Sequence, residues 1–462
     1  MTINKTLKKT IIKQNEHSID RDDISKNALK VLYRLKDAGY QAYLVGGGVR
    51  DLLLGKKPKD FDVATDAHPD EIRALFRNCR LIGRRFRLAH ILFGRDVIEV
   101  ATFRGPHEGG TSPHAGKNEE GRIIRDNVYG SLEEDAIRRD FTVNALYYNI
   151  RDDSIVDFTG GMQDLHNKVL RMIGDVSTRY REDPVRMLRA VRFAAKLNFT
   201  IEPEAHQLIF ERKELLEGIP VARLFDETVK LFQGGYGLNC FRLLRRYQLF
   251  ELLFPLTETL IKETGEQNSA TLKLVEQALI NTDERIAQGK SVNPAFFMAV
   301  LLWYPVQDYK NRFIERGQHE VEALISASRE VITRQQAHTS IPKRFSMMMR
   351  DIWHMQSQLQ HPTKKRALRT LTNKRFRAGY DFLLLRESVG EHELKTICDW
   401  WTDIQTHSPE EQEQMCSELG GPKRRRGTEN SHGAKKSRRR KKRKAVKLLV
   451  EPVSAQPGNT RA

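Results

Sequence analysis

Two aspartates, Asp60 and Asp62, are the residues of this sequence whose types and spacing best suit chemistry on a phosphate. In an extended segment, residues two apart point to the same face, so both carboxylates can bind one divalent cation or bridge two. The residue between them, Phe61, would then point into the core. We therefore treat Asp60 and Asp62 as catalytic candidates and as candidate metal ligands.

A glycine turn precedes this pair in the segment YLVGGGVRDLLL. Ala42 to Val45 is predicted as a strand, Gly46 to Gly48 as a tight turn and Val49 to Leu54 as the opening of a helix. Glycines let the backbone approach a phosphate, N–H groups at a helix start favour anions, and Arg50 adds a cation. The spacing matches neither a Walker A loop nor the dinucleotide fingerprint. A triphosphate held here, with metal at the carboxylates, would stabilise charge on a transferring nucleotidyl group.

Each motif alone also has an ordinary interpretation. Many glycine triplets are only turns, and many Asp-x-Asp pairs lie in solvated loops. Their order within one short segment is what favours a functional site.

Two basic segments follow the carboxylates. RRDFTVNAL places Arg138, Arg139 and Asp140 at an element boundary, where they can face a cleft or form an ordinary surface salt-bridge cluster. Further on, Asp183 is suited to cap a helix whose first turn contains Pro184.

Along that helix, arginines recur every three residues at Arg186, Arg189 and Arg192, which puts them on one side. Such a stripe is often a solvated face. It can also bind phosphates, and Asp183 with Arg186 offers an acceptor and a donor fork to the edge of an unstacked base.

The surrounding elements predict a mixed first third and an all-helical remainder. An amphipathic helix is expected from Asp22 to Gly39, and strands are expected at Ile91–Phe93 and Val97–Phe103. Gly105 to Arg125 is polar and glycine-rich, which predicts a long loop. From Pro203 onward helical patterns replace strands, and the tryptophans fall on apolar faces typical of a core. The predicted fold class is α+β.

Length and composition limit the class of protein. A chain of 462 residues exceeds what one core usually supports, so several domains are expected. The four cysteines, Cys79, Cys240, Cys398 and Cys416, are widely spaced, which argues against zinc or disulfides and favours a reducing compartment. Since neither a secretory h-region nor a membrane-spanning apolar run is found, we expect a cytoplasmic protein.

The formal charge of +18 is concentrated near the C-terminus. Between Lys423 and Lys447, fourteen Lys and Arg stand against one acid, Glu429, a net charge of +13. Such a block repels itself and cannot bury a core, which predicts a disordered arm for a polyanion. RNA is the preferred polyanion, because counterion release would make its binding salt-dependent. A solubilising tail and a peripheral membrane contact stay open as alternatives.

Four segments together resemble the bacterial class II nucleotidyltransferases, the family of tRNA CCA-adding enzymes and bacterial poly(A) polymerases: LVGGGVRD, KDFDVAT, RRDFTVNAL and EDPVRMLRAVRFA. The resemblance implies a nucleotidyltransferase head with a small mixed sheet, then helical neck, body and tail regions. It implies a flexible N-terminus over residues 1–21, the head over 22–173, a nucleotide- and RNA-binding neck over 174–235, an RNA-binding body and tail over 236–415, and the basic arm over 416–462.

The same resemblance implies the roles of the acids. Asp60 and Asp62 would bind two Mg²⁺ ions, or Mn²⁺ in their place, and Asp140 would be the third active-site acid, with Glu99 as the second candidate for that role. The implied reaction is attack of an RNA 3′-hydroxyl on the α-phosphate of ATP, with release of pyrophosphate. No histidine or cysteine nucleophile is required.

The resemblance also implies the nucleotide contacts. Asp183 and Arg186 would read the incoming base. The triphosphate would be bound by the glycine turn and by arginines, namely Gly46, Gly47, Arg50, Arg139, Arg189 and Arg192.

Within the family, the third glycine of the turn, the segment GRRFRLAHILFG and the basic extension are typical of the polymerase subgroup. No His-Asp dipeptide marks an appended phosphohydrolase domain. The implied activity is template-independent polyadenylation, which would promote RNA processing and decay. CCA addition to tRNA shares every catalytic residue and is the alternative; a non-catalytic RNA-binding adaptor is a third reading. The implied partners are 3′ ends of mRNA, small regulatory RNA or tRNA precursors, ATP and RNA-decay proteins.

Overall fold

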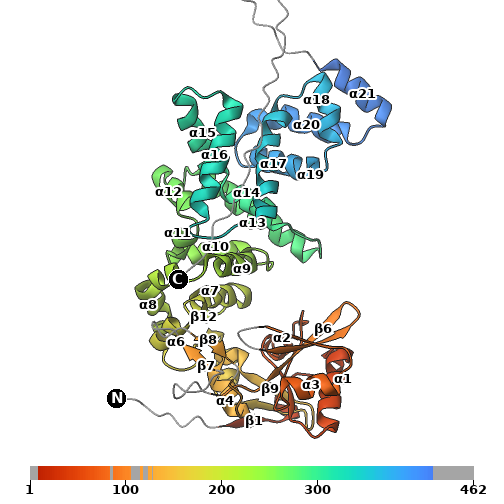
Figure 1. The fold of residues 1–462 in the computed structure, drawn as a ribbon, viewed down its shortest axis with the longest axis vertical. Helices are drawn as coiled ribbons and strands as arrows, with labels where there is room; N and C mark the ends of the chain where they lie inside the picture. Colours follow the sequence, from red (N-terminus) through yellow and green to blue (C-terminus); the bar gives the residue numbers. More distant parts are fainter. Residues whose placement is uncertain (1–8, 84–86, 106–114, 118–122, 127, 420–462) are drawn as a thin grey trace, which may run out of the picture. The chain divides into compact units, whose positions relative to one another are not determined.

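The computed structural model describes residues 9–83, 87–105, 115–117, 123–126 and 128–419 (Figure 1). Within these residues, strands occur only between Thr10 and Ile201, and the chain beyond them is helical. The expected α+β class is therefore confirmed. Most of the predicted basic arm lies outside the described residues. Its first residues belong instead to helix α21 (Pro409–Glu418), where Cys416 is buried.

One eight-stranded sheet organises the first third. Neighbouring strands pair antiparallel except β3 and β6, which are parallel. The predicted strand at Ala42–Val45 is confirmed with its bounds. In spatial order the strands are β1 (Thr10–Ile12), β10 (Ile155–Asp157), β9 (Leu146–Asn149), β2 (Ala42–Val45), β3 (Asp62–Thr65), β6 (Asp96–Thr102), β5 (Leu88–Phe93) and β4 (Cys79–Ile82).

Alternation along β6 decides which side chains reach the site. Ile98, Val100 and Thr102 are buried on one face, while Glu99 points to the other and is exposed. Helix α1 (Lys26–Asp37) packs on this buried face of the sheet. The apolar side chains of the helix are buried in the shared core. It starts later than predicted, because Ser25 caps it by accepting a hydrogen bond from the amide of Asn27.

The predicted flexible N-terminus is wrong for its ordered part. Thr10–Ile12 pairs antiparallel with Ile155–Asp157 as the edge strand of the sheet. Arg21 then holds the segment by an ion pair with Asp153, 2.6 Å between Nε and Oδ1. The sequence pattern did not reveal this strand, because a three-residue run is too short to show alternation.

The predicted long loop at Gly105–Arg125 also contains structure. β7 (Ala115–Lys117) and β8 (Ile123–Asp126) form an antiparallel pair, and the rest of this segment lies outside the described residues.

Helices supply the remaining elements. A short parallel pair of strands, β11 (Val169–Leu170) with β12 (Thr200–Ile201), joins the chain before helix α7 (Val185–Leu197) to the chain after it. The helices of the first half are α2 (Gly47–Leu53), α3 (Pro69–Leu75), α4 (Leu132–Arg138), α5 (Gly161–His166), α6 (Val176–Glu182), α7 (Val185–Leu197), α8 (Pro203–Arg212), α9 (Val221–Phe232) and α10 (Gly237–Arg246). Those of the second half are α11 (Leu249–Leu253), α12 (Pro255–Thr264), α13 (Ala270–Ala287), α14 (Pro294–Leu301), α15 (Trp303–Glu315), α16 (Glu320–Gln335), α17 (Lys343–Gln360), α18 (Lys364–Leu371), α19 (Phe376–Ser388) and α20 (Lys395–Ile404).

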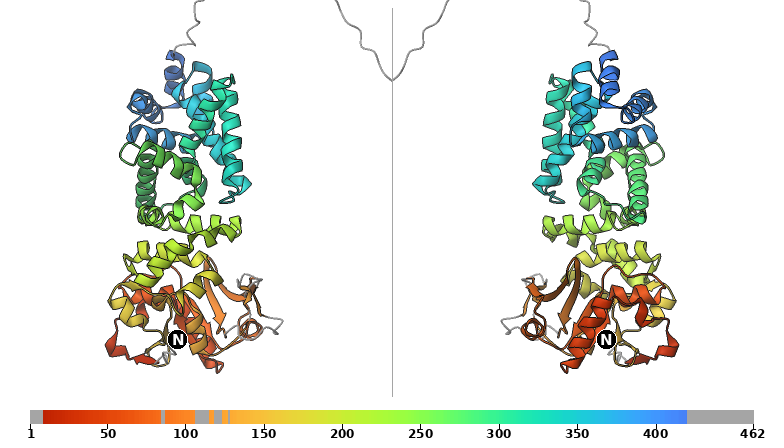
Figure 2. Two further views of the ribbon diagram at one scale, coloured as in Figure 1. Left: turned by 90° about the vertical axis from the view of Figure 1, so that its left-hand side faces the viewer. Right: turned by 90° about the vertical axis from the view of Figure 1, so that its right-hand side faces the viewer.

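Figure 2 shows the C-terminal helices packed together. Buried aromatic residues lie in the core between them. Trp303, Trp353 and Trp401 are buried, which confirms their predicted place in the core; Trp400 is only partly covered. The indole N–H of Trp353 donates to the carbonyl of Ala299 at 3.0 Å, so burial leaves that donor satisfied.

Candidate active site

The glycine turn and the two aspartates meet because β2 and β3 pair antiparallel. Val45, the last residue of β2, lies opposite Asp62, the first residue of β3. Gly46 follows directly, and a side-chain carbon placed on it would lie 3.7 Å from Asp62 Oδ2. Asp60 precedes the strand and is exposed, whereas Phe61 is 9% exposed and packs in the core, as predicted.

Each glycine of the turn has its own requirement. Gly46 has a φ of 76°, a conformation that side-chain-bearing residues adopt at a cost. Helix α2 begins at Gly47, so the turn is shorter than predicted. A side-chain carbon on Gly48 would lie 3.3 Å from the carbonyl oxygen of Asp60, so the absence of a side chain lets α2 pack against the aspartate segment.

Glu99 joins the aspartates through the one parallel pair of the sheet. It is in register with Asp62 on the neighbouring strand, and its side chain is 47% exposed. The ring Nε2 of His90, on β5, lies 3.3 Å from Glu99 Oε1. Burial, then the charge of Glu99 and, less strongly, that of Asp60 raise the pKa of Asp62 to about 6, although Arg139 opposes the shift. The structure thus gathers three carboxylates near one another.

This donor set fits a hard divalent cation. Carboxylate oxygens are the ligands that Mg²⁺ prefers, and a cation would relieve the repulsion that raises the Asp62 pKa. In the described part of the chain, no three His, Cys, Asp or Glu side chains already point at a shared position. Binding would therefore require the exposed side chain of Asp60 or Glu99 to rotate toward Asp62.

Arg139 also lies next to the glycine turn. Its Nε and Nη2 donate to Asp135, and its Nε also donates to the hydroxyl of Tyr147 at 2.9 Å. Tyr147 in turn donates to Asp135 at 2.7 Å. The remaining terminal nitrogen, Nη1, faces Gly46, 3.7 Å from where its side-chain carbon would be. A cation is thus fixed beside the turn and near Asp62.

Asp140 has a different environment from the other acids. Arg189 donates to it through Nε at 2.7 Å, and the amide of Phe141 donates to it at 2.9 Å. Burial raises the pKa of Asp140, but the ion pair with Arg189 outweighs it and holds that pKa down at about 2. Asp140 is therefore a charged anchor for Arg189, while Glu99 is the acid in register with Asp62.

Arg50, predicted to contact the triphosphate, lies inside the protein and is 1% exposed. Its Nε donates to Asp51 at 2.8 Å and its Nη1 donates to Asn144. Lys196 of α7 donates to the same Asp51 at 2.9 Å. These buried acceptors hold the Arg50 guanidinium against the glycine turn, where a side-chain carbon on Gly47 would lie 3.4 Å from its Nη2.

The predicted base-reading pair lies at the junction of α6 and α7. Arg186 is buried and donates to Glu182 at 3.1 Å, while Asp183 accepts from Arg223 of α9 at 2.7 Å. Asp183 does not cap α7 with its side chain as predicted; the cap position is Pro184. Both candidates are therefore held in place by residues of the adjoining helices.

The other predicted arginines of α7 surround one aromatic ring. The guanidinium carbons of Arg192, Arg50 and Arg189 lie 4.6, 5.3 and 5.5 Å from the ring centre of Phe193. Three guanidinium groups thus share one aromatic ring, and two of them, Arg50 and Arg189, are also paired with the acids Asp51 and Asp140.

Sequence reasoning missed the residues that position the others: Asp135, Asn144, Tyr147, Phe193, Lys196 and Arg223. Asn144 and Tyr147 lie in or beside RRDFTVNAL, so that motif held a usable signal. Arg223 donates a hydrogen bond to Asp183, 40 positions earlier, and no local pattern could predict that contact.

Three family models match the chain. Residues 42–171 match the poly A polymerase head domain, residues 198–261 the probable RNA- and SrmB-binding site of polymerase A, and residues 316–445 the polymerase A arginine-rich C-terminus. The first match contains the three carboxylates and Arg139.

Similar proteins extend over most of the chain. Poly(A) polymerase I of Salmonella typhimurium is 51% identical over 90% of this chain and 91% of its own. The CCA-adding enzyme of Lactobacillus helveticus is 38% identical, over 50% of this chain and 55% of its own. A solved tRNA nucleotidyltransferase complexed with a primer tRNA and an incoming ATP analog has a TM-score of 0.53 at 24% identity, covering 81% of this chain and 98% of that one. This last likeness supports the fold. Among the described residues, no helix is long and apolar enough to cross a membrane.

Proposed function

This chain belongs to the bacterial poly(A) polymerase I family, and we propose that Asp60, Asp62 and Glu99 form the catalytic centre for its reaction. It is a polynucleotide adenylyltransferase, which transfers AMP from ATP to RNA 3′ ends without a template and releases pyrophosphate. The observation that carries the proposed centre is the register, which sets Asp62 beside the glycine turn on one side and Glu99 on the other.

The three carboxylates would hold two Mg²⁺ ions. Bound Mg²⁺ would supply Lewis-acid chemistry, lowering the pKa of the attacking 3′-hydroxyl and neutralising charge on the departing pyrophosphate. Asp62 supports this role best, because its carboxylate lies next to the turn and its pKa is raised by burial and by the charges of its acidic neighbours. Glu99 takes the place of third acid, and Asp140 acts through Arg189 as a positioning residue.

The glycine turn and Arg139 would bind the triphosphate. Gly46 and Gly47 leave room for phosphate oxygens next to the backbone. Arg139 would contribute Nη1 as a fixed donor, since its other nitrogens are engaged by Asp135 and Tyr147. A donor held before the substrate arrives costs no reorganisation when charge develops on the phosphates.

The neck would complete the nucleotide site. Arg189 and Arg192 would add positive charge toward the phosphates, and Arg50 would support them from the interior through Phe193 and Asp51. Asp183 and Arg186 would read the adenine edge with an acceptor and a donor fork. Their engagement by Arg223 and Glu182 fixes the orientation of both groups.

The RNA would be bound by the neck, the helical body and the basic arm. The net charge of +13 between Lys423 and Lys447 supports a polyanion partner. With ATP and RNA 3′ ends as substrates, the chain would act in RNA processing and decay in the cytoplasm.

An incorporation assay with single nucleotides tests this function. The purified full chain receives either a generic RNA or a tRNA, with Mg²⁺ and one NTP at a time. We expect long tails from ATP alone. Incorporation of CTP confined to tRNA ends would instead establish CCA addition, and no incorporation of any nucleotide would establish a non-catalytic RNA-binding protein.

A further inference from the structure

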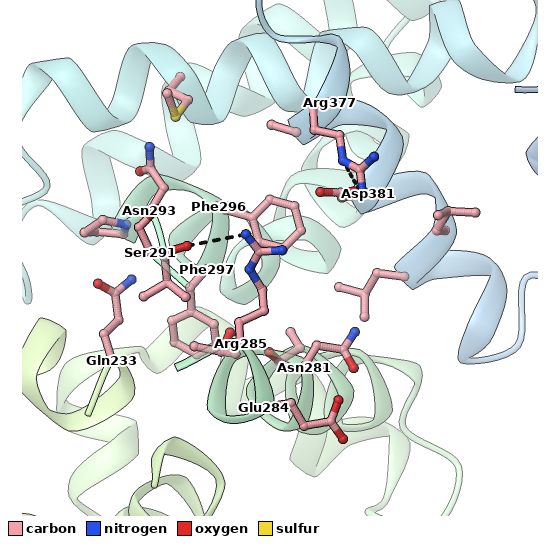
Figure 3. Close-up of a pocket in the computed structure, with 18 of the residues that line it drawn as sticks. Gln233, Asn281, Glu284, Arg285, Ser291, Asn293, Phe296, Phe297, Arg377 and Asp381 are labelled. Carbon is pink, nitrogen blue, oxygen red and sulfur yellow. Dashed lines mark hydrogen bonds and ion pairs between the residues drawn. The ribbon is translucent and has the colours of Figure 1, made fainter. Parts of the chain in front are cut away.

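A cavity of about 910 Å³ lies in the helical body, far along the chain from the carboxylates. It is enclosed by α13, α14, α17 and α19, with Gln233 at the end of α9 also at its edge (Figure 3). Its volume is at the upper end of the range for small-ligand sites, about 300 to 1,000 Å³. No step of the reaction described above uses it.

The floor of this body cavity is apolar and partly aromatic. Phe297, Ala278 and Leu385 are buried there, and Phe296 is only partly covered. The ring of Phe296 is braced edge-on by Phe382, with 5.9 Å between ring centres. A fixed aromatic side chain that is partly exposed in a cavity is suited to stack with a planar ligand.

The rim is polar, and its cations outnumber its acids, since Arg285, Lys374, Arg375 and Arg377 stand against Glu284 and Asp381. Arg285 reaches into the cavity from α13 (Figure 3), and its recorded hydrogen bond goes to the carbonyl of Ser291 at 3.4 Å. Among the described residues, neither Arg285 nor Lys374 forms an ion pair with a carboxylate. Asp381, an acid of the same cavity, is neutralised by Arg377 at 2.9 Å.

We propose that the body cavity binds one or two unstacked nucleotides of single-stranded RNA. The inference rests on the proposed function, because it assigns a subsite to the RNA substrate of that reaction. A base would stack on Phe296, the carboxamides of Asn281 and Asn293 would bond its edge, and Arg285 with Lys374 would bind the flanking phosphates. Duplex RNA would not enter, since its bases are stacked and paired.

The choice of RNA follows from the whole lining. An apolar small molecule would make no use of the rim cations and carboxamides, which are exposed to solvent. An anion such as free phosphate would make no use of the aromatic floor. A nucleotide within an RNA strand would use both the aromatic floor and the polar rim of the cavity.

Binding of labelled oligo(A), about twelve nucleotides long, tests the proposal with the full chain at physiological salt. Arg285→Gln removes a phosphate contact and is expected to weaken binding about fivefold. Phe296→Leu keeps an apolar side chain without an aromatic face and is expected to weaken binding about tenfold. Lys273→Gln is the matched control, because Lys273 is an exposed cation of the same helix outside the cavity, and we expect it to bind as wild type.

A blunt RNA hairpin serves as the second ligand. We expect Arg285→Gln and Lys273→Gln to bind the hairpin equally. Oligo(A) binding by Arg285→Gln within twofold of Lys273→Gln would overturn the proposal. An equal loss on hairpin and oligo(A) would also overturn it, because it would indicate an external contact with the RNA backbone. Since Arg285 is exposed, this variant should fold even if Phe296→Leu does not.

The assay is run in EDTA and without ATP, so its outcome does not depend on catalysis. A wild-type protein that binds oligo(A) through Arg285 but incorporates no AMP would contradict the proposed function and leave this inference standing. An active wild type whose Arg285→Gln variant binds like the control would contradict this inference alone.

Discussion

The carboxylates of the head and the arginines of the neck differ in how their charges are balanced. Asp62 stands beside two further acids, and burial and repulsion raise its pKa to about 6. Asp140, in contrast, is paired with Arg189 and keeps a pKa of about 2. A bound cation would stabilise a cluster of acids whose negative charge the protein leaves unbalanced. An acid that is already paired with an arginine serves instead to hold side chains in position.

The largest expected effect follows from removing the most buried acid of the unbalanced cluster. Asp62→Ala should lower the rate of AMP incorporation by about a thousandfold or more, since metal stabilisation of the phosphoryl charge is lost. Affinity for oligo(A), measured without ATP, should stay close to that of wild type. A variant that incorporates AMP at the wild-type rate would contradict the metal assignment.

The second prediction compares Glu99 with Asp140 directly. Glu99→Gln should lower the incorporation rate about a hundredfold with little change in stability, because its side chain is half exposed. Asp140→Asn should lower the rate less, about tenfold, but should reduce the free energy of unfolding by about 2 kcal/mol, because Arg189 loses its charged partner. Incorporation kinetics and denaturant unfolding of both variants separate the two roles. The reverse pattern would restore Asp140 as the third acid.

The basic arm should affect RNA affinity but little else. Deleting residues 420–462 removes the arm and retains Leu419, which packs against the tail core. Affinity for RNA should fall about tenfold at low salt and much less at high salt, while the KM for ATP stays constant. The same affinity as the full chain at every salt concentration would show that the arm does not bind RNA.

The smallest effect is expected at the support of Arg139. Tyr147→Phe removes the hydroxyl that bonds Asp135 and Arg139, so the guanidinium becomes less fixed. The KM for ATP should rise about threefold, in line with the loss of one hydrogen bond between charged and neutral groups. As a control, Tyr148→Phe removes a hydroxyl on the same strand that bonds Asp153 instead. A Tyr147→Phe variant with the KM of this control would rule out a role for the hydroxyl.

Local patterns predicted the elements that carry the site, because each depends on neighbours in sequence. The strand at Ala42–Val45 and the inward Phe61 follow from the two-residue period of side chains in an extended segment. The turn at Gly46 follows from the backbone conformations that glycine allows. The helices that replace strands after Pro203, such as α9 at Val221–Phe232, likewise agree with the predicted helical remainder.

Contacts between distant segments were not predictable in this way. Arg50 lies against the glycine turn, but its burial there depends on Asn144, 94 positions away. The choice between Glu99 and Asp140 depends on the parallel register of β3 with β6 and on an ion pair to α7. Sequence patterns show which residues carry charge, while the fold decides which charges are neutralised.

Metal binding in the absence of substrate tests the central claim most directly. Mn²⁺ can replace Mg²⁺ at carboxylate sites, and its electron paramagnetic resonance signal reports the free ion. The account predicts that wild type and Asp140→Asn bind Mn²⁺ alike, whereas Asp62→Asn and Glu99→Gln bind it at least about tenfold more weakly. Weak binding by Asp140→Asn together with wild-type binding by Glu99→Gln would contradict it.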